Sequence, residues 1–80
     1  DMDSENFIDK LDKKTFLKML EVELSLLDEK HRSTFLLRYQ EEMSIKEISE
    51  VLGISEGTIK SRLFYTIRKL SEKLKVFSLN

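Results

Sequence analysis

The sequence has 80 residues and a formal net charge of −1 at pH 7, which suits one small domain. It contains no cysteine and a single histidine, so disulfides and thiolate metal sites are excluded and a histidine-built metal site is not expected. No apolar run approaches the roughly 18 residues of a membrane-spanning helix, so we expect a cytoplasmic domain with no membrane partner and no cofactor.

An all-α fold is predicted, because apolar residues recur at helical spacing and no alternating strand pattern is visible. The chain has no proline, and its two glycines lie within five residues of each other. We expect residues 1–11 to be a linker or a cloning remnant, and residues 12–80 to form a domain of four helices.

The first three helices are predicted from apolar spacing and capping residues. The first spans about 12–26, with apolar residues at spacings of one, three and four: Phe16, Leu17, Leu20, Leu24 and Leu27. The second begins after Asp28, a favourable N-cap, and continues to about Glu42. The third begins at Ser44, since Ser44 and Glu47 have the spacing of a capping box. Its apolar face comprises Ile45, Ile48, Val51 and Leu52.

A short turn separates the third predicted helix from the fourth. Gly53 is expected to end the third helix in the left-handed conformation, and Ser55 to cap the fourth, which runs to about Val76. So short a turn makes two helices cross steeply, as in a helix-turn-helix. The spacing alone is equally compatible with an ordinary corner between two helices.

The fourth helix has two contrasting faces at about 100° per residue. One arc is the predicted core face: Ile59, Leu63, Ile67, Leu70 and Leu74. The opposite side carries Gly57, Thr58, Ser61, Phe64, Tyr65 and Arg68, flanked by Lys60, Arg62 and Lys69. Small and hydroxyl-bearing residues let a helix approach base edges in the major groove. Residues 55–75 hold six basic side chains against two acidic ones, which favours a polyanionic partner.

The remaining candidate residues give weaker indications of function. Phe64 and Tyr65 suit contacts with thymine methyl groups or sugars, or else packing against the first helix. His31 is expected at the surface or its boundary and not as a ligand, and Arg32 and Arg38 are expected to form ion pairs. No catalytic constellation can be assembled from the scattered acidic residues, so the chain is not expected to be an enzyme.

The segment from Leu27 to Leu70 resembles region 4 of bacterial sigma-70-type RNA polymerase sigma factors, most closely the extracytoplasmic-function group. The resemblance rests on FLLRYQEEMSIKEIS, on LGISEGTIKSRL and on the closing Arg68-Lys69-Leu70. It implies a helix-turn-helix of the winged-helix-like superfamily, without a wing. It also implies recognition of the minus-35 element of double-stranded promoter DNA, docking on the β flap of RNA polymerase, and capture by an anti-sigma factor.

By position, the resemblance assigns DNA contacts to Gly57, Thr58, Lys60, Ser61, Phe64 and Tyr65. Arg62 matches a basic position that contacts the DNA backbone or pairs within the domain, and Arg68 is expected to follow the backbone. Many family members carry arginine at the position of Tyr65, so a different promoter preference is expected. Two alternatives stay open: the helix-turn-helix output domain of a response-regulator activator, and a protein-interaction domain anchored by Phe64 and Tyr65.

Overall fold

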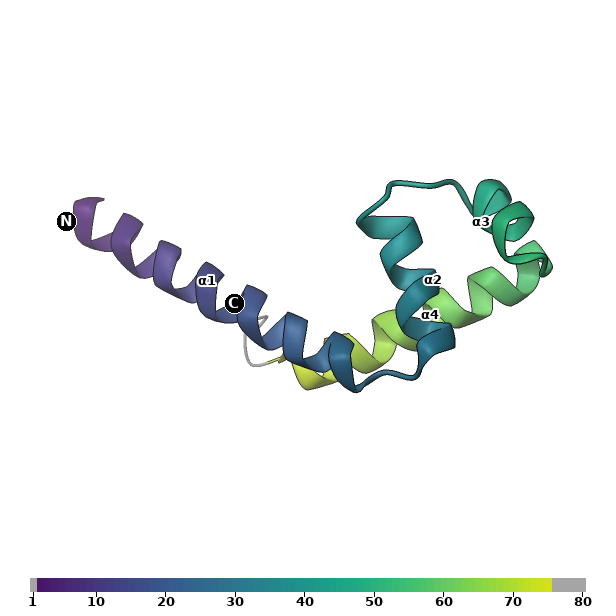
Figure 1. Ribbon diagram of the computed structural model, residues 1–80. Helices are drawn as coiled ribbons and strands as arrows, with labels where there is room; N and C mark the ends of the chain where they lie inside the picture. Colours follow the sequence, from purple (N-terminus) through teal and green to yellow (C-terminus); the bar gives the residue numbers. More distant parts are fainter. Residues whose placement is uncertain (1, 76–80) are drawn as a thin grey trace.

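The computed structural model describes the backbone of residues 2–75 and the side chains of residues 13–75. It contains four helices: α1 (Met2–Leu26), α2 (Glu29–Tyr39), α3 (Ile45–Leu52) and α4 (Glu56–Lys73). The described residues include no strand, so the all-α prediction is confirmed. Helix α4 packs against the other three, with α3 near its start and α1 near its end, while the first half of α1 extends beyond the bundle (Figure 1).

Helix α1 begins ten residues earlier than the predicted start at Asp12. Neither proline nor glycine occurs before Leu27, so nothing in the sequence interrupts the helical backbone there. The helix crosses the predicted boundary between a linker at 1–11 and a domain at 12–80. That division stays a prediction. Leu17 is 54% exposed and therefore does not belong to the buried face, whereas Phe16, Leu20 and Leu24 are half-buried.

Helix α2 begins where predicted but ends at Tyr39, three residues before Glu42. The carboxylate of Asp28 accepts the first-turn amide of His31 at 3.1 Å, as an N-cap should. Glu42 has a φ of 56°, which turns the chain out of the helix.

The two arginines of α2 differ in their partners. Arg32 pairs with Glu29, as expected, and also donates to the backbone carbonyl of Leu27 at 3.1 Å. For Arg38 the expected ion pair is wrong: its guanidinium donates to the carbonyl of Met43 at 2.9 Å. That bond fastens the end of α2 to the loop before α3.

Helix α3 forms the predicted capping box. Ser44 Oγ accepts the amide of Glu47 at 3.0 Å, and Glu47 Oε1 accepts the amide of Ser44 at 2.8 Å. Gly53 ends the helix with a φ of 68°, the left-handed conformation expected of it. Val51 was predicted on the apolar face, but it is 63% exposed because no other element of the described chain covers that side of α3.

Helix α4 supplies half of the buried residues, but its buried face differs from the prediction at one position. Ile59 and Leu63 join Ile48 of α3 in a buried cluster, around which pack Leu37, Met43, Ile45, Leu52 and Ile54. Leu70 and Leu74 are buried further along, whereas Ile67 is 40% exposed and Thr66 is fully buried instead. Helix α1 covers Ile67 incompletely, leaving it in an apolar groove with Phe16, Leu20 and Phe35.

The end of α4 also falls short of the prediction. The helix stops at Lys73, whereas the predicted end, Val76, lies outside the described residues.

Burying Ile48 and Ile59 completely stabilises the fold by about 2–3 kcal/mol each, so these two residues hold α3 against α4.

Candidate nucleic-acid interface

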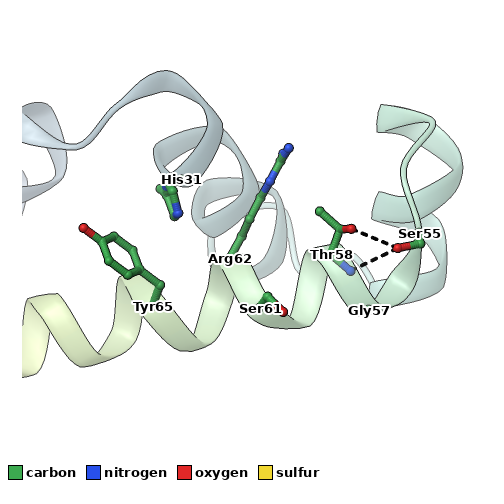
Figure 2. Close-up of a pocket in the computed structure, with 7 residues that line it drawn as sticks. All are labelled: His31, Ser55, Gly57, Thr58, Ser61, Arg62 and Tyr65. Carbon is green, nitrogen blue, oxygen red and sulfur yellow. Dashed lines mark hydrogen bonds between the residues drawn. The ribbon is translucent and has the colours of Figure 1, made fainter.

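The start of α4 is fixed by its capping serine. Ser55 Oγ accepts the amide of Thr58 at 3.1 Å and shares a second hydrogen bond of 2.9 Å with Thr58 Oγ1 (Figure 2). Because Ser55 follows the left-handed residue Gly53 by only two positions, the cap and the turn together set the direction in which α4 leaves α3. The predicted helix-turn-helix is therefore present.

Gly57 leaves bare backbone on the exposed side of this first turn. A Cβ atom at position 57 would meet Ser55 Oγ at 3.9 Å, which is ordinary van der Waals contact. Packing within the domain therefore does not require a glycine there. The missing side chain gives a partner closer access to the helix backbone, as the sequence predicted for a helix that enters a groove.

A shallow depression, which we call the outer hollow, lies between the first three turns of α4 and the start of α2 (Figure 2). It is lined by His31, Ser55, Gly57, Thr58, Ser61, Arg62 and Tyr65. Five of the eight predicted DNA-binding residues thus meet on one surface. The sequence did not predict the two other lining residues, Ser55 and His31, as part of this surface.

The remaining predicted residues lie on the same outward side of α4 but outside the outer hollow. Phe64 is 70% exposed, so the alternative that it packs against α1 is wrong. Lys60 is exposed. Arg68 lies one turn later, in a second depression with Tyr65, Lys69, Glu72 and Lys73. Its Nε is 3.9 Å from Glu72 Oε1, an exposed and weak pairing that leaves its charge accessible.

Tyr65 is half-exposed and makes its own contact within the domain. Its ring lies against the imidazole of His31, with ring centroids 4.6 Å apart and planes inclined by 48°. The ammonium group of Lys69 lies 5.8 Å from the centre of the same ring. Tyr65 is thus held between α2 and the next turn of α4, while its outer edge stays open to a partner.

His31 is in turn held by Asp28. Their side chains form a hydrogen bond of 2.5 Å between Nδ1 and Oδ1. This bond, and then the backbone amide of His31, lower the pKa of Asp28 below its ordinary value of 3.8. The spacing of Asp28 and His31 is visible in the sequence, but no local pattern relates His31 to Tyr65. Only the packing of α2 on α4 brings them together.

Other kinds of site receive no support from residues 13–75. No group of three or more histidine, cysteine, aspartate or glutamate residues in this part of the chain could hold a metal ion. Among the described helices, none is both long enough and apolar enough to cross a membrane. The outer hollow and the basic side chains that follow it therefore form the best candidate site.

Comparison with known proteins identifies the family. The family model for sigma-70, region 4, matches residues 17–73, which include all eight predicted site residues. The RNA polymerase sigma-E factor of Streptomyces coelicolor is 43% identical over 51 residues, covering 64% of this chain and 29% of that protein. The ECF RNA polymerase sigma factor SigL of Mycobacterium tuberculosis is 43% identical over 47 residues, covering 59% of this chain and 27% of that protein.

A third relative comes from another bacterial genus. The ECF RNA polymerase sigma factor SigW of Bacillus subtilis is 37% identical over 49 residues, covering 61% of this chain and 26% of that protein. The chain thus spans less than a third of the length of each of these three relatives. The family match decides against the response-regulator alternative. The chain belongs to the sigma-70 region 4 family, of the extracytoplasmic-function type.

Proposed function

We propose that this chain is the promoter-recognition domain of an alternative sigma factor, and that it reads the minus-35 element through the major groove. The observation that carries the proposal is the outward side of α4, where small and hydroxyl-bearing residues precede an exposed aromatic pair. Gly57, Thr58 and Ser61 give the slim approach that base edges require, and Phe64 is free to meet a thymine methyl group.

The charges beside these residues support DNA as the partner. Lys60 and Arg62 flank the outward residues on opposite sides of α4, and Arg68 lies further along it, so positive charge is available to phosphates on both sides of a groove. The amino terminus of α4 adds a partial positive charge at the same end. Binding through phosphates positions the domain, and contacts from Ser61, Phe64 and Tyr65 select the sequence.

Docking on the RNA polymerase β flap and capture by an anti-sigma factor are the second part of the proposal. Docking on the flap while DNA is bound requires a surface that DNA leaves free. The apolar groove of Phe16, Leu20, Phe35 and Ile67 is a candidate for such a surface, because α1, α2 and the second half of α4 line it and none of the residues around the outer hollow does. We assign neither partner to particular residues. Working on promoters would place the protein in the bacterial cytoplasm.

The proposal is tested by selecting binding sites from duplexes with a randomised centre and measuring fluorescence anisotropy on the enriched sequence. We expect the 80-residue chain to enrich one motif and to prefer it over a scrambled duplex. Its logarithmic affinity should fall with logarithmic salt by about 0.9 for each phosphate contacted. If no duplex binds in a salt-sensitive way at low ionic strength, the protein-interaction alternative, anchored by Phe64 and Tyr65, replaces this one.

A further inference from the structure

His31 lies on α2, yet it forms one wall of the outer hollow on α4. Its ring lies against that of Tyr65, with 4.6 Å between centroids, and the side chain of Arg62 extends from the preceding turn of α4 toward α2 (Figure 2). The side chain is 23% exposed, so the ring is partly packed but open to the hollow. A phosphate held above Ser61 would therefore lie within reach of a residue outside the recognition helix.

The hydrogen bond to Asp28 determines which nitrogen of His31 carries a proton. A carboxylate can only accept, so the Nδ1 atom that lies 2.5 Å from Asp28 Oδ1 must donate. In the neutral imidazole, Nε2 then has a lone pair and no proton, and it cannot donate to a phosphate. Protonation turns Nε2 into a donor and adds a positive charge. The ring thus changes from a poor partner of phosphate to a good one.

We propose that protonated His31 binds a phosphate of the DNA backbone at the outer hollow, so that promoter affinity rises as the pH falls. Imidazole side chains change charge between about pH 5 and 8, which sets the pH range of the test. The inference rests on the proposed function. It extends the DNA-binding surface from α4 to the start of α2.

The charged and titratable groups around His31 come from the start of α2 and from α4. At the start of α2, the carboxylate of Asp28 accepts from His31 Nδ1, and Lys30 precedes His31 in the chain. From α4, Arg62 and Tyr65 face it across the hollow, and Lys69 lies behind the Tyr65 ring. None of the residues that line the hollow comes from α1 or α3. A bound phosphate would add a second negative charge beside His31, next to that of Asp28.

Two substitutions separate the charge of His31 from its shape. His31→Phe keeps an aromatic ring against Tyr65 but cannot be protonated, and His31→Lys keeps a positive charge at every pH used. Each is compared with wild type by anisotropy on the selected duplex, from about pH 5.8 to 8 at constant ionic strength. Circular dichroism confirms at both limits that each variant is folded. The α-amino group, which titrates near pH 8, is common to all three proteins.

We expect wild type to bind between about two- and tenfold more tightly at the acidic limit than at the basic limit. Its salt slope should steepen by about 0.9 at the acidic limit, because one more phosphate is neutralised. His31→Phe should bind at every pH as wild type does at the basic limit, and His31→Lys should bind tightly throughout. Because DNA would favour the protonated ring, the imidazole resonance of wild type should titrate at higher pH with duplex than without it.

The outcomes distinguish the inference from the proposed function. If wild type and His31→Phe bind DNA with the same pH dependence, or if DNA leaves the imidazole titration unchanged, the inference is wrong while DNA recognition stands. The resonance experiment uses wild type alone, so it decides the question even if a variant does not fold. If no duplex binds at any pH, the proposed function itself fails and the inference falls with it.

Discussion

The hydroxyl of Ser49 in α3 donates a hydrogen bond of 2.5 Å to the backbone carbonyl of Ile54, across the turn that leads into α4. The carbonyl of Ser49 accepts the amides of Gly53 and Ile54 at 2.9 and 3.3 Å. One residue thus closes the turn with its side chain and its backbone. The direction of α4, and with it the position of every proposed DNA contact, depends on this closure.

Substitutions in the turn should destabilise the domain by different mechanisms. Ser49→Ala should lower the free energy of unfolding by about 1 kcal/mol, because the Ile54 carbonyl loses its donor. Gly53→Ala should lower it by about 1–2 kcal/mol, because position 53 has a φ of 68°. An added Cβ atom would meet no other atom within 4 Å, so the cost comes from the backbone conformation and not from a clash. The matched control is Gly57→Ala, which should raise stability by about 0.5–1 kcal/mol. Urea unfolding measures all three, and equal effects at both glycines would contradict the turn geometry.

Two buried threonines offer a second matched pair. Thr66 Oγ1 is buried and has no hydrogen-bond partner among the described residues, whereas Thr34 Oγ1 donates to the carbonyl of Lys30 at 2.8 Å. Valine has nearly the same shape but no hydroxyl. Thr66→Val should therefore raise the free energy of unfolding by about 1 kcal/mol, and Thr34→Val should lower it or leave it unchanged. Thermal unfolding followed by circular dichroism measures the stability of both variants. If Thr66→Val were the less stable of the two, the Thr66 hydroxyl would have a hydrogen-bond partner in solution.

Stability should fall at acidic pH because two capping carboxylates become protonated. The backbone and then the side-chain hydrogen bond of Ser44 lower the pKa of Glu47 below its ordinary value of 4.5. A folded-state pKa below the unfolded value gives stability that is full above about pH 5 and is lost as the pH falls through the folded-state pKa. The same sign holds for Asp28, whose ordinary value is 3.8.

Replacing these carboxylates by amides should flatten that dependence. We expect the double variant Glu47→Gln, Asp28→Asn to lose less stability than wild type when the pH is lowered from about 6 to 3. Urea unfolding at both pH values makes the comparison. An identical loss in both proteins would mean that other carboxylates cause the acid sensitivity.

Base recognition and phosphate binding should separate by mutation. Ser61→Ala and Phe64→Ala should change the preference among promoter sequences, at a cost of about 1–3 kcal/mol at a contacted base pair. Lys60→Ala should weaken all sequences alike and reduce the salt slope by about one contact. Each of the three side chains is exposed, so unfolding should change by less than about 0.5 kcal/mol. Fluorescence anisotropy on selected and scrambled duplexes measures both effects. If Lys60→Ala changed the sequence preference while Ser61→Ala and Phe64→Ala weakened all sequences alike, the assigned roles would be reversed.

The helix ends that depend on local chemistry could be predicted from the sequence. Asp28, Ser44 and Ser55 each cap a helix because an oxygen on the side chain reaches an amide three residues later. Gly53 ends α3 because glycine tolerates the left-handed conformation. These interactions span few residues, so the neighbouring sequence determines them.

Exposure and long-range contacts could not be predicted in the same way. Leu17, Val51 and Ile67 fit apolar patterns, but whether each is covered depends on where another helix lies. For the same reason, the outward residues of α4 were predictable from helical spacing, whereas His31 was not. Its contact with Tyr65 joins residues 34 positions apart, and helical periodicity carries no information about that distance.

Helix α4 both carries the proposed recognition residues and packs against the other three helices. Its amides around Ile59 and Leu63 should therefore exchange hydrogen with solvent through global unfolding, whereas those at the start of α1 should exchange through local fraying. A recognition element that is packed in place before binding gives up little conformational entropy on binding. Adaptation to different DNA sequences then falls to side-chain rotamers and to the DNA itself, while the helix backbone stays fixed.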